Sequence, residues 1–133
     1  MRVLALDYGS ARCGCAVSDP TGTLATPLAV VERPATRKGL AALAALVRDR
    51  EVGRVVVGLP LGLSGADTEQ TREARAFAAR LEEVVAVPVS LYDERFTTRI
   101  AERSGSRTTS ADSRAAAVLL EDWLARHGSE VAP

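Results

Sequence analysis

The sequence lacks the features that mark membrane and disulfide-bonded proteins. No apolar run approaches the roughly 20 residues that a membrane-spanning helix needs. The apolar stretch at 3–6 is too short for the core of a signal peptide. Cys13 and Cys15 lie two residues apart, a poor spacing for a disulfide within a strand, and there is no second pair to complete a zinc site. We therefore expect a cytoplasmic protein in which both cysteines are buried and reduced.

Aromatic residues and an excess of charge of one sign are also lacking. Aromatics make up 4% of the chain, too few for a platform that stacks successive bases. Lys and Arg together number 17, as do Asp and Glu, so the net charge indicates no partner. A neutral chain can still bind nucleic acid when its charges are segregated, and their positions therefore matter more than their sum.

The sequence does contain enough apolar residues to form the core of one α/β domain. The 133 residues are 47% hydrophobic, and we expect a single domain over 1–133 with a frayed tail at about 127–133. Apolar runs and helical periodicity predict strands at 3–6, 13–17, 24–31, 54–59 and 87–92, and helices at 36–50, 66–84, 97–103 and 110–126.

The order of these elements predicts a mixed sheet. Short turns join the first three strands, which favours an antiparallel meander. Strand-helix-strand crossovers join parallel strands and are right-handed. We therefore expect a five-stranded sheet flanked by helices, in which strands 1, 4 and 5 are parallel and strands 2 and 3 are antiparallel.

Acidic residues stand where two of the parallel strands end. Asp7 closes an otherwise apolar strand, and Asp93 and Glu94 close the fifth strand. Capping of a turn or a helix is the simpler interpretation of each. However, ligand sites in open α/β sheets lie beyond the carboxyl ends of parallel strands. Side chains alternate along a strand, so only one of Asp93 and Glu94 can point into a shared site, and the pattern leaves open which one.

A third acid, Asp112, continues the apolar stripe of the last helix. It lies four residues before Ala116, at a position where a carboxylate would also favour the helix N-terminus. Three acids that converge on one sheet edge favour metal coordination over capping. Carboxylates are hard ligands suited to Mg²⁺ or Mn²⁺, and a pair of such ions can drive phosphodiester cleavage.

Four ordered segments resemble a known family. They are LALDYGSARCGCAVSD, VVVGLPLGLSG, VSLYDERFTT and DSRAAAVLLEDWL. Together they resemble the YqgF/RuvX family of pre-16S rRNA nucleases, which is also described as Holliday junction resolvase-like. The resemblance implies an RNase H-like fold and hydrolysis of phosphodiester bonds. It also implies that Asp7, Glu94 and Asp112 form the catalytic, metal-binding triad, with Glu94 preferred over Asp93.

Basic residues near the triad are the candidates for substrate binding. By resemblance, Arg95 contacts phosphate, whereas the family's Lys-Arg pair is here Ala11-Arg12 and its basic loop is shortened to 104–110. Arg12, Arg99 and Arg103 are the other candidate bases, the last two spaced like one stripe of a helix, although a solvated face is the simpler interpretation of that stripe. The glycine-rich loop that contains Gly62 follows the fourth strand, where such turns cradle phosphates.

Several functions remain open at this point. Within the nuclease interpretation, the substrate is precursor 16S rRNA, cut at its 5′ end, or branched DNA cut by a monomer or homodimer. A nucleotide-binding protein of the actin and sugar-kinase superfamily would need two such domains. A non-catalytic nucleic-acid-binding factor in transcription or ribosome assembly is the remaining alternative, against which the three retained acids argue.

Overall fold

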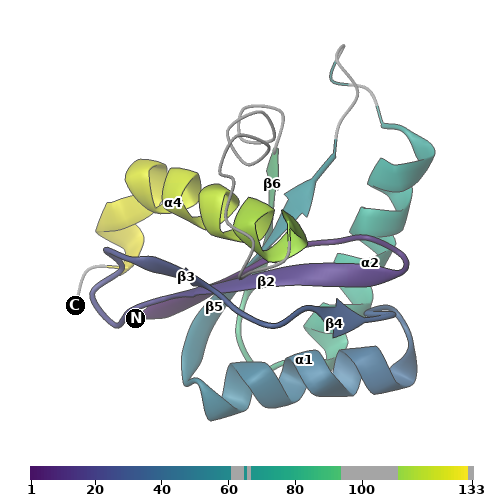
Figure 1. Cartoon of the computed structure of the whole chain (residues 1–133), viewed down its shortest axis with the longest axis horizontal. Coiled ribbons are helices and arrows are strands. Elements are labelled where there is room, and N and C mark those ends of the chain that lie inside the picture. The colour runs from purple at the N-terminus through teal and green to yellow at the C-terminus, as the bar shows by residue number, and fades with distance from the viewer. Residues whose placement is uncertain (61–64, 66, 94–110, 132–133) are drawn as a thin grey trace.

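The computed structural model describes residues 1–60, 65, 67–93 and 111–131 (Figure 1). The central sheet has the strand order β3-β2-β1-β5-β6, and a short strand, β4, also pairs with β2. The described strands are β1 Arg2–Asp7, β2 Arg12–Ser18, β3 Ala25–Pro27, β4 Val31–Glu32, β5 Val52–Leu59 and β6 Val89–Asp93. The described helices are α1 Arg37–Asp49, α2 Glu69–Val84 and α4 Ala111–Val131.

The strand directions confirm the predicted α/β sheet. Strand β5 lies parallel to both β1 and β6, whereas β2 is antiparallel to β1 and to β3. The carboxyl ends of the three parallel strands therefore meet at one edge of the sheet, which we call the carboxyl edge. Asp7, Leu59 and Asp93 are the last residues of these strands.

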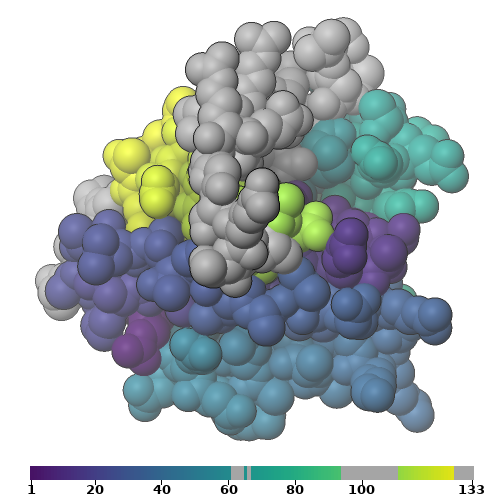
Figure 2. Space-filling model, in the orientation of Figure 1, coloured from purple at the N-terminus to yellow at the C-terminus, as the bar shows by residue number. Residues whose placement is uncertain are grey.

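Helices cover both faces of the sheet (Figure 1). One face, here the α4 face, packs Val3 and Ala5 of β1 against Trp123 and its neighbours in α4. On the other, the α1/α2 face, Leu4 and Leu6 join the core that α1 and α2 complete. Alternation along each strand thus decides which layer a side chain enters. In the space-filling view, the segment that contains β3 and β4 runs between α4 and α1 (Figure 2).

Threonine caps define where α1 and α2 begin. The Thr36 hydroxyl accepts a hydrogen bond from the Gly39 amide at 3.1 Å. Thr68 and Thr71 form a reciprocal capping box at the start of α2, which is why this helix begins three residues later than the sequence predicted. The Thr71 hydroxyl also donates to the Pro60 carbonyl at 2.7 Å, which ties α2 to the carboxyl end of β5.

The third predicted strand, 24–31, is wrong as a single strand. Its residues form β3 and β4, which pair with opposite ends of β2, so the described strands number six and not five. Pro27 faces Ala16 at a pair without hydrogen bonds, so its missing N–H does not interrupt the ladder with β2. The next amide, that of Leu28, donates to the Cys15 carbonyl at 2.8 Å, and the chain then crosses to the other end of β2.

The last helix extends beyond its predicted end at Arg126. α4 runs to Val131, with a kink at His127, whose φ of −124° and ψ of 20° are not helical. The His127 ring stacks on Trp123, with 4.7 Å between the ring centroids. The helix predicted at 97–103 lies outside the described residues. No helix in the described part of the chain is long and apolar enough to cross a membrane.

Candidate active site at the carboxyl edge

Asp7 lies at the end of β1, on the α4 face of the sheet. Val3 and Ala5 pack on that face, and Asp7 follows them with the same period of two. The residue is half-buried, and its partner across the ladder in β2 is Gly14. The strand therefore presents a carboxylate at the carboxyl edge, beneath the start of α4.

The first turn of α4 rests directly on Gly14. A Cβ atom at this glycine would lie 1.9 Å from the Asp112 carbonyl oxygen and 2.8 Å from the Ser113 nitrogen. Ser113 is fully buried, and its hydroxyl accepts a hydrogen bond from the Cys15 amide at 3.3 Å. Because Gly14 pairs with Asp7, these contacts place the backbone of Asp112 close to the end of β1.

The negative charges of Asp7 and Asp112 both affect the pKa of the Cys13 thiol. Its pKa lies well above the ordinary value because of its hydrogen bond with Cys15 and its burial, and the negative charges of Asp7 and Asp112 raise it further. Both cysteines are free and buried, as expected. Asp7 and Asp112 are thus both near enough to Cys13 to affect its pKa, although Cys13 itself packs into the core of the α1/α2 face.

Arg12 forms an ion pair with Asp112. Its Nε atom lies 2.9 Å from Oδ2 of the carboxylate, and the two side chains are 61% and 39% exposed. An ion pair this exposed contributes at most about 1 kcal/mol to stability. Arg12, predicted to bind substrate, is thus placed at the site, with a guanidinium group that can exchange its partner at little cost.

Strand alternation at the end of β6 puts Asp93 on the opposite face of the sheet from Asp7. Tyr92 is on the α4 face, where its hydroxyl donates to the Asp122 carboxylate. Val89 packs into the core of the α1/α2 face. By alternation Asp93, four residues after Val89, shares the face of Val89 and not that of Asp7. Glu94, the preferred third acid, lies outside the described residues.

Other predicted site residues also fall outside the described part of the chain. They are Gly62, Arg95, Arg99 and Arg103. Among the residues that the structure describes, no group of three His, Cys, Asp or Glu side chains is placed to hold a metal. The two carboxylates that are described offer hard oxygen ligands of the kind that Mg²⁺ and Mn²⁺ prefer.

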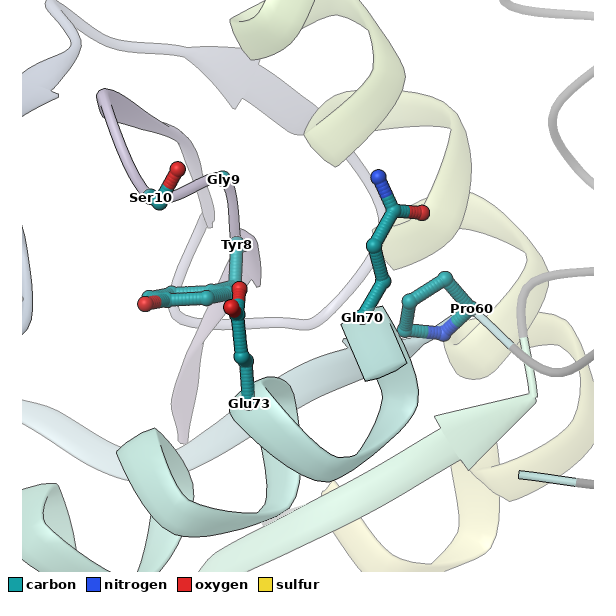
Figure 3. A pocket seen from close by; sticks show the side chains of 6 residues that line it. All are labelled: Tyr8, Gly9, Ser10, Pro60, Gln70 and Glu73. Atoms are coloured by element: carbon teal, nitrogen blue, oxygen red, sulfur yellow. The ribbon is translucent and has the colours of Figure 1, made fainter. Parts of the chain in front are cut away.

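A pocket on the other side of Asp7 was not predicted from the sequence. Its volume is about 130 Å³, and it lies between the turn after β1 and the first turns of α2 (Figure 3). Tyr8 is half-buried here, stacks on the buried Phe77 and packs against the core of the α1/α2 face. Gln70 and Glu73 of α2 were missed because, in the sequence, they resemble any solvated helix face.

Sequence comparison identifies the family. The chain matches the family described as "RuvX: Holliday junction resolvase" over residues 1–126. It is 46% identical to a protein of Koribacter versatilis named "Putative pre-16S rRNA nuclease", over 96% of this chain and 88% of that protein. A protein of the same name from Maridesulfovibrio salexigens is 42% identical over 95% of this chain and 99% of its own length.

Structure comparison identifies the fold. RuvC of T. thermophilus, solved in complex with a Holliday junction substrate, matches with a TM-score of 0.57 and 19% identity over 97% of both chains. A second T. thermophilus RuvC structure matches with a TM-score of 0.56 and 17% identity, over 96% of this chain and 97% of that one. These likenesses confirm the predicted RNase H-like fold. The family match and the two relatives show that the chain belongs to the RuvX (YqgF) family of nucleases.

Proposed function

We propose that this nuclease uses Mg²⁺ or Mn²⁺ held by the carboxylates of Asp7, Glu94 and Asp112. The observation that carries the proposal is the contact through Gly14, which joins the end of β1 to the start of α4. The acids lie at the carboxyl edge, where open α/β sheets bind their ligands. When bound, ions of this kind activate water and stabilise the leaving oxygen in phosphodiester hydrolysis.

Alternation along β6 supports Glu94 as the third ligand. Tyr92 lies on the α4 face with Asp7, and Asp93 lies on the opposite face. Continuing the period of two assigns the next acid, Glu94, to the face of Tyr92. The resemblance of the DER motif to the family implies the same choice.

We assign phosphate binding to the basic residues and the loop near the triad. Arg12 is already there, paired with Asp112 through an exposed contact. A guanidinium can bind a phosphate bidentately, and the phosphate of a nucleic acid would compete with the carboxylate for it. The sequence adds Arg95, Arg99, Arg103 and Gly62 to this surface.

The relatives favour RNA as the substrate. Proteins more than 40% identical to this chain are named for pre-16S rRNA, and we propose that this one trims the 5′ end of precursor 16S rRNA in the cytoplasm. Branched DNA is the second candidate, because the family carries the name of Holliday junction resolvase and the fold matches RuvC. A resolvase would act as a homodimer, so that its two cuts are matched.

The decisive experiment is cleavage of a matched panel of nucleic acids. Precursor 16S rRNA ends, unstructured single strands and four-way DNA junctions are incubated with the protein and Mg²⁺, Mn²⁺ or chelator. We expect metal-dependent cleavage, with the rRNA ends cut fastest. Faster resolution of the junction by matched cuts would reassign the substrate to DNA. Equal cleavage in chelator would remove the metal from the mechanism.

A further inference from the structure

The pocket beside Asp7 is formed by three parts of the fold that meet at the carboxyl edge. Its lining residues are Tyr8, Gly9, Ser10, Pro60, Gln70 and Glu73. They come from the turn after β1, the end of β5 and the start of α2. The volume of about 130 Å³ is somewhat below the about 150 Å³ of a cavity that holds a benzene ring. The pocket is therefore too small to enclose a nucleotide or a two-ring base, and it can receive only the edge of a base that lies across its opening.

Two polar side chains converge on this pocket from α2. Gln70 and Glu73 lie three residues apart, on one face of the helix, and both extend toward the turn after β1 (Figure 3). The capping box and the hydrogen bond from Thr71 to Pro60 fix the backbone that carries them, while both side chains are exposed at the pocket. A carboxylate and an amide thus stand side by side at the opening of the pocket.

Tyr8 forms an aromatic wall of the pocket. Its ring stacks on Phe77 at 4.5 Å between centroids, and Phe77 is 1% exposed, so the wall is held by the core. The pKa of Tyr8 is raised, first by burial and then by the charge of Glu73, which keeps the phenol neutral and indicates that the carboxylate lies close to it. The pocket therefore combines aromatic surface with a nearby hydrogen-bond acceptor.

The position of the pocket relates it to the proposed metal site. Tyr8 follows Asp7 directly, and consecutive side chains of a strand point to opposite faces of the sheet. Asp7 accordingly continues the α4 face, whereas Tyr8 packs with the core of the α1/α2 face. A nucleic-acid strand that crosses the carboxyl edge with one phosphate at Asp7 would bring a neighbouring base over the pocket.

We propose that this pocket receives the Watson–Crick edge of the base of a nucleotide next to the cleaved phosphodiester, and that it selects guanine; this inference rests on the proposed nuclease function. RNA-binding proteins commonly splay out single bases and read their Watson–Crick edges. Guanine presents two neighbouring donors there, N1–H and the N2 amine, to which the carboxylate of Glu73 can bind bidentately. The amide of Gln70 can donate to O6.

Cut-site sequencing of a randomised substrate tests the proposal against every base at once. A library of precursor 16S rRNA ends with randomised bases around the cut is digested with Mn²⁺, and the new ends are sequenced. We expect guanine to be enriched about tenfold at one position within two nucleotides of the cut, the discrimination typical of a bidentate contact. Glu73→Ala should abolish the enrichment, and inosine, which lacks the N2 amine, should be cut more slowly than guanine.

The matched control is Glu82→Ala, which removes the same charge from an exposed site farther along α2. Loss of a negative charge near the edge can strengthen RNA binding in general, so base preference and not affinity is the readout. An unchanged preference in the Glu73 variant, folded as judged by its melting curve, overturns the guanine pocket. The proposal is also overturned if the preference is lost when the 2′-hydroxyl is removed from the substrate while the base is kept. Absence of cleavage of any substrate would sink the proposed function itself.

Discussion

The backbone of Asp112 rests on Gly14, which is the strand partner of Asp7. A Cβ atom at position 14 would stand 1.9 Å from the Asp112 carbonyl oxygen, a distance that no side-chain motion can relieve because both groups belong to the backbone. One glycine therefore sets the height at which α4 crosses the sheet. It also sets the separation of two proposed metal ligands that lie far apart in the sequence.

Gly14→Ala should abolish Mn²⁺ binding and cleavage while lowering the stability of the fold only moderately. The new methyl group must push the first turn of α4 away from β2, and overpacking of this kind costs about 1–3 kcal/mol. Asp112 would move with the helix, so we expect Mn²⁺ binding and cleavage to be lost while the chain still folds. Urea unfolding and calorimetric Mn²⁺ titration measure the two effects separately.

Gly53→Ala is the control for this change. The close contacts of a Cβ atom there would be with the flexible Met1 side chain, which is 38% exposed, while the nearest backbone atom, the Arg2 carbonyl oxygen, would lie at an ordinary 3.8 Å. We expect its unfolding free energy to change by less than about 1 kcal/mol. If Gly14→Ala behaves like Gly53→Ala and binds Mn²⁺ normally, the contact does not position Asp112.

Asp112 and Gly14 differ in how far their roles could be predicted from the sequence. The acid stood out because it continued an apolar stripe, whereas a glycine inside a strand indicates a close approach without naming the group that approaches. Gln70 and Glu73 carried no signal, because their role depends on where the caps place α2. The break between β3 and β4 carried no signal either, because the apolar run continues across it and the nitrogen of Pro27 faces away from β2.

Arg12→Ala should separate metal binding from substrate binding. The guanidinium lies 2.9 Å from Asp112, so its loss frees the carboxylate, and we expect Mn²⁺ to bind more tightly by up to about fivefold, equivalent to about 1 kcal/mol. Binding of RNA should weaken, with its log–log salt dependence shallower by about 0.7–0.9. Arg48→Ala, which breaks an exposed pair on α1, is the control. Unchanged metal and RNA binding would place Arg12 outside the site.

Asp7→Asn should abolish cleavage and leave the fold intact. The amide keeps the shape of the carboxylate but lacks the charge that holds a divalent ion. Removing one of two neighbouring acids also relieves repulsion, so the melting temperature in chelator should stay the same or rise. Asp49→Asn, on the exposed end of α1, should retain full activity. An active Asp7→Asn enzyme would falsify the metal mechanism.

The last prediction concerns Arg99 and Arg103, which lie outside the described residues and are spaced like one stripe of a helix. If both contact phosphates, each releases counterions on binding, and their joint replacement by Ala should lower the steepness of the salt dependence by up to about two units. The loss should be similar for unrelated sequences, because phosphate contacts position a nucleic acid without reading its bases. Anisotropy titrations at several salt concentrations, in the Asp7→Asn background, measure the slope. Arg37→Ala with Arg48→Ala removes the same charge from α1 and should leave the slope unchanged. If the Arg99 and Arg103 variant keeps the full slope, the stripe is solvated surface, and the glycine-rich loop at 62–65 becomes the better candidate for the phosphate contacts.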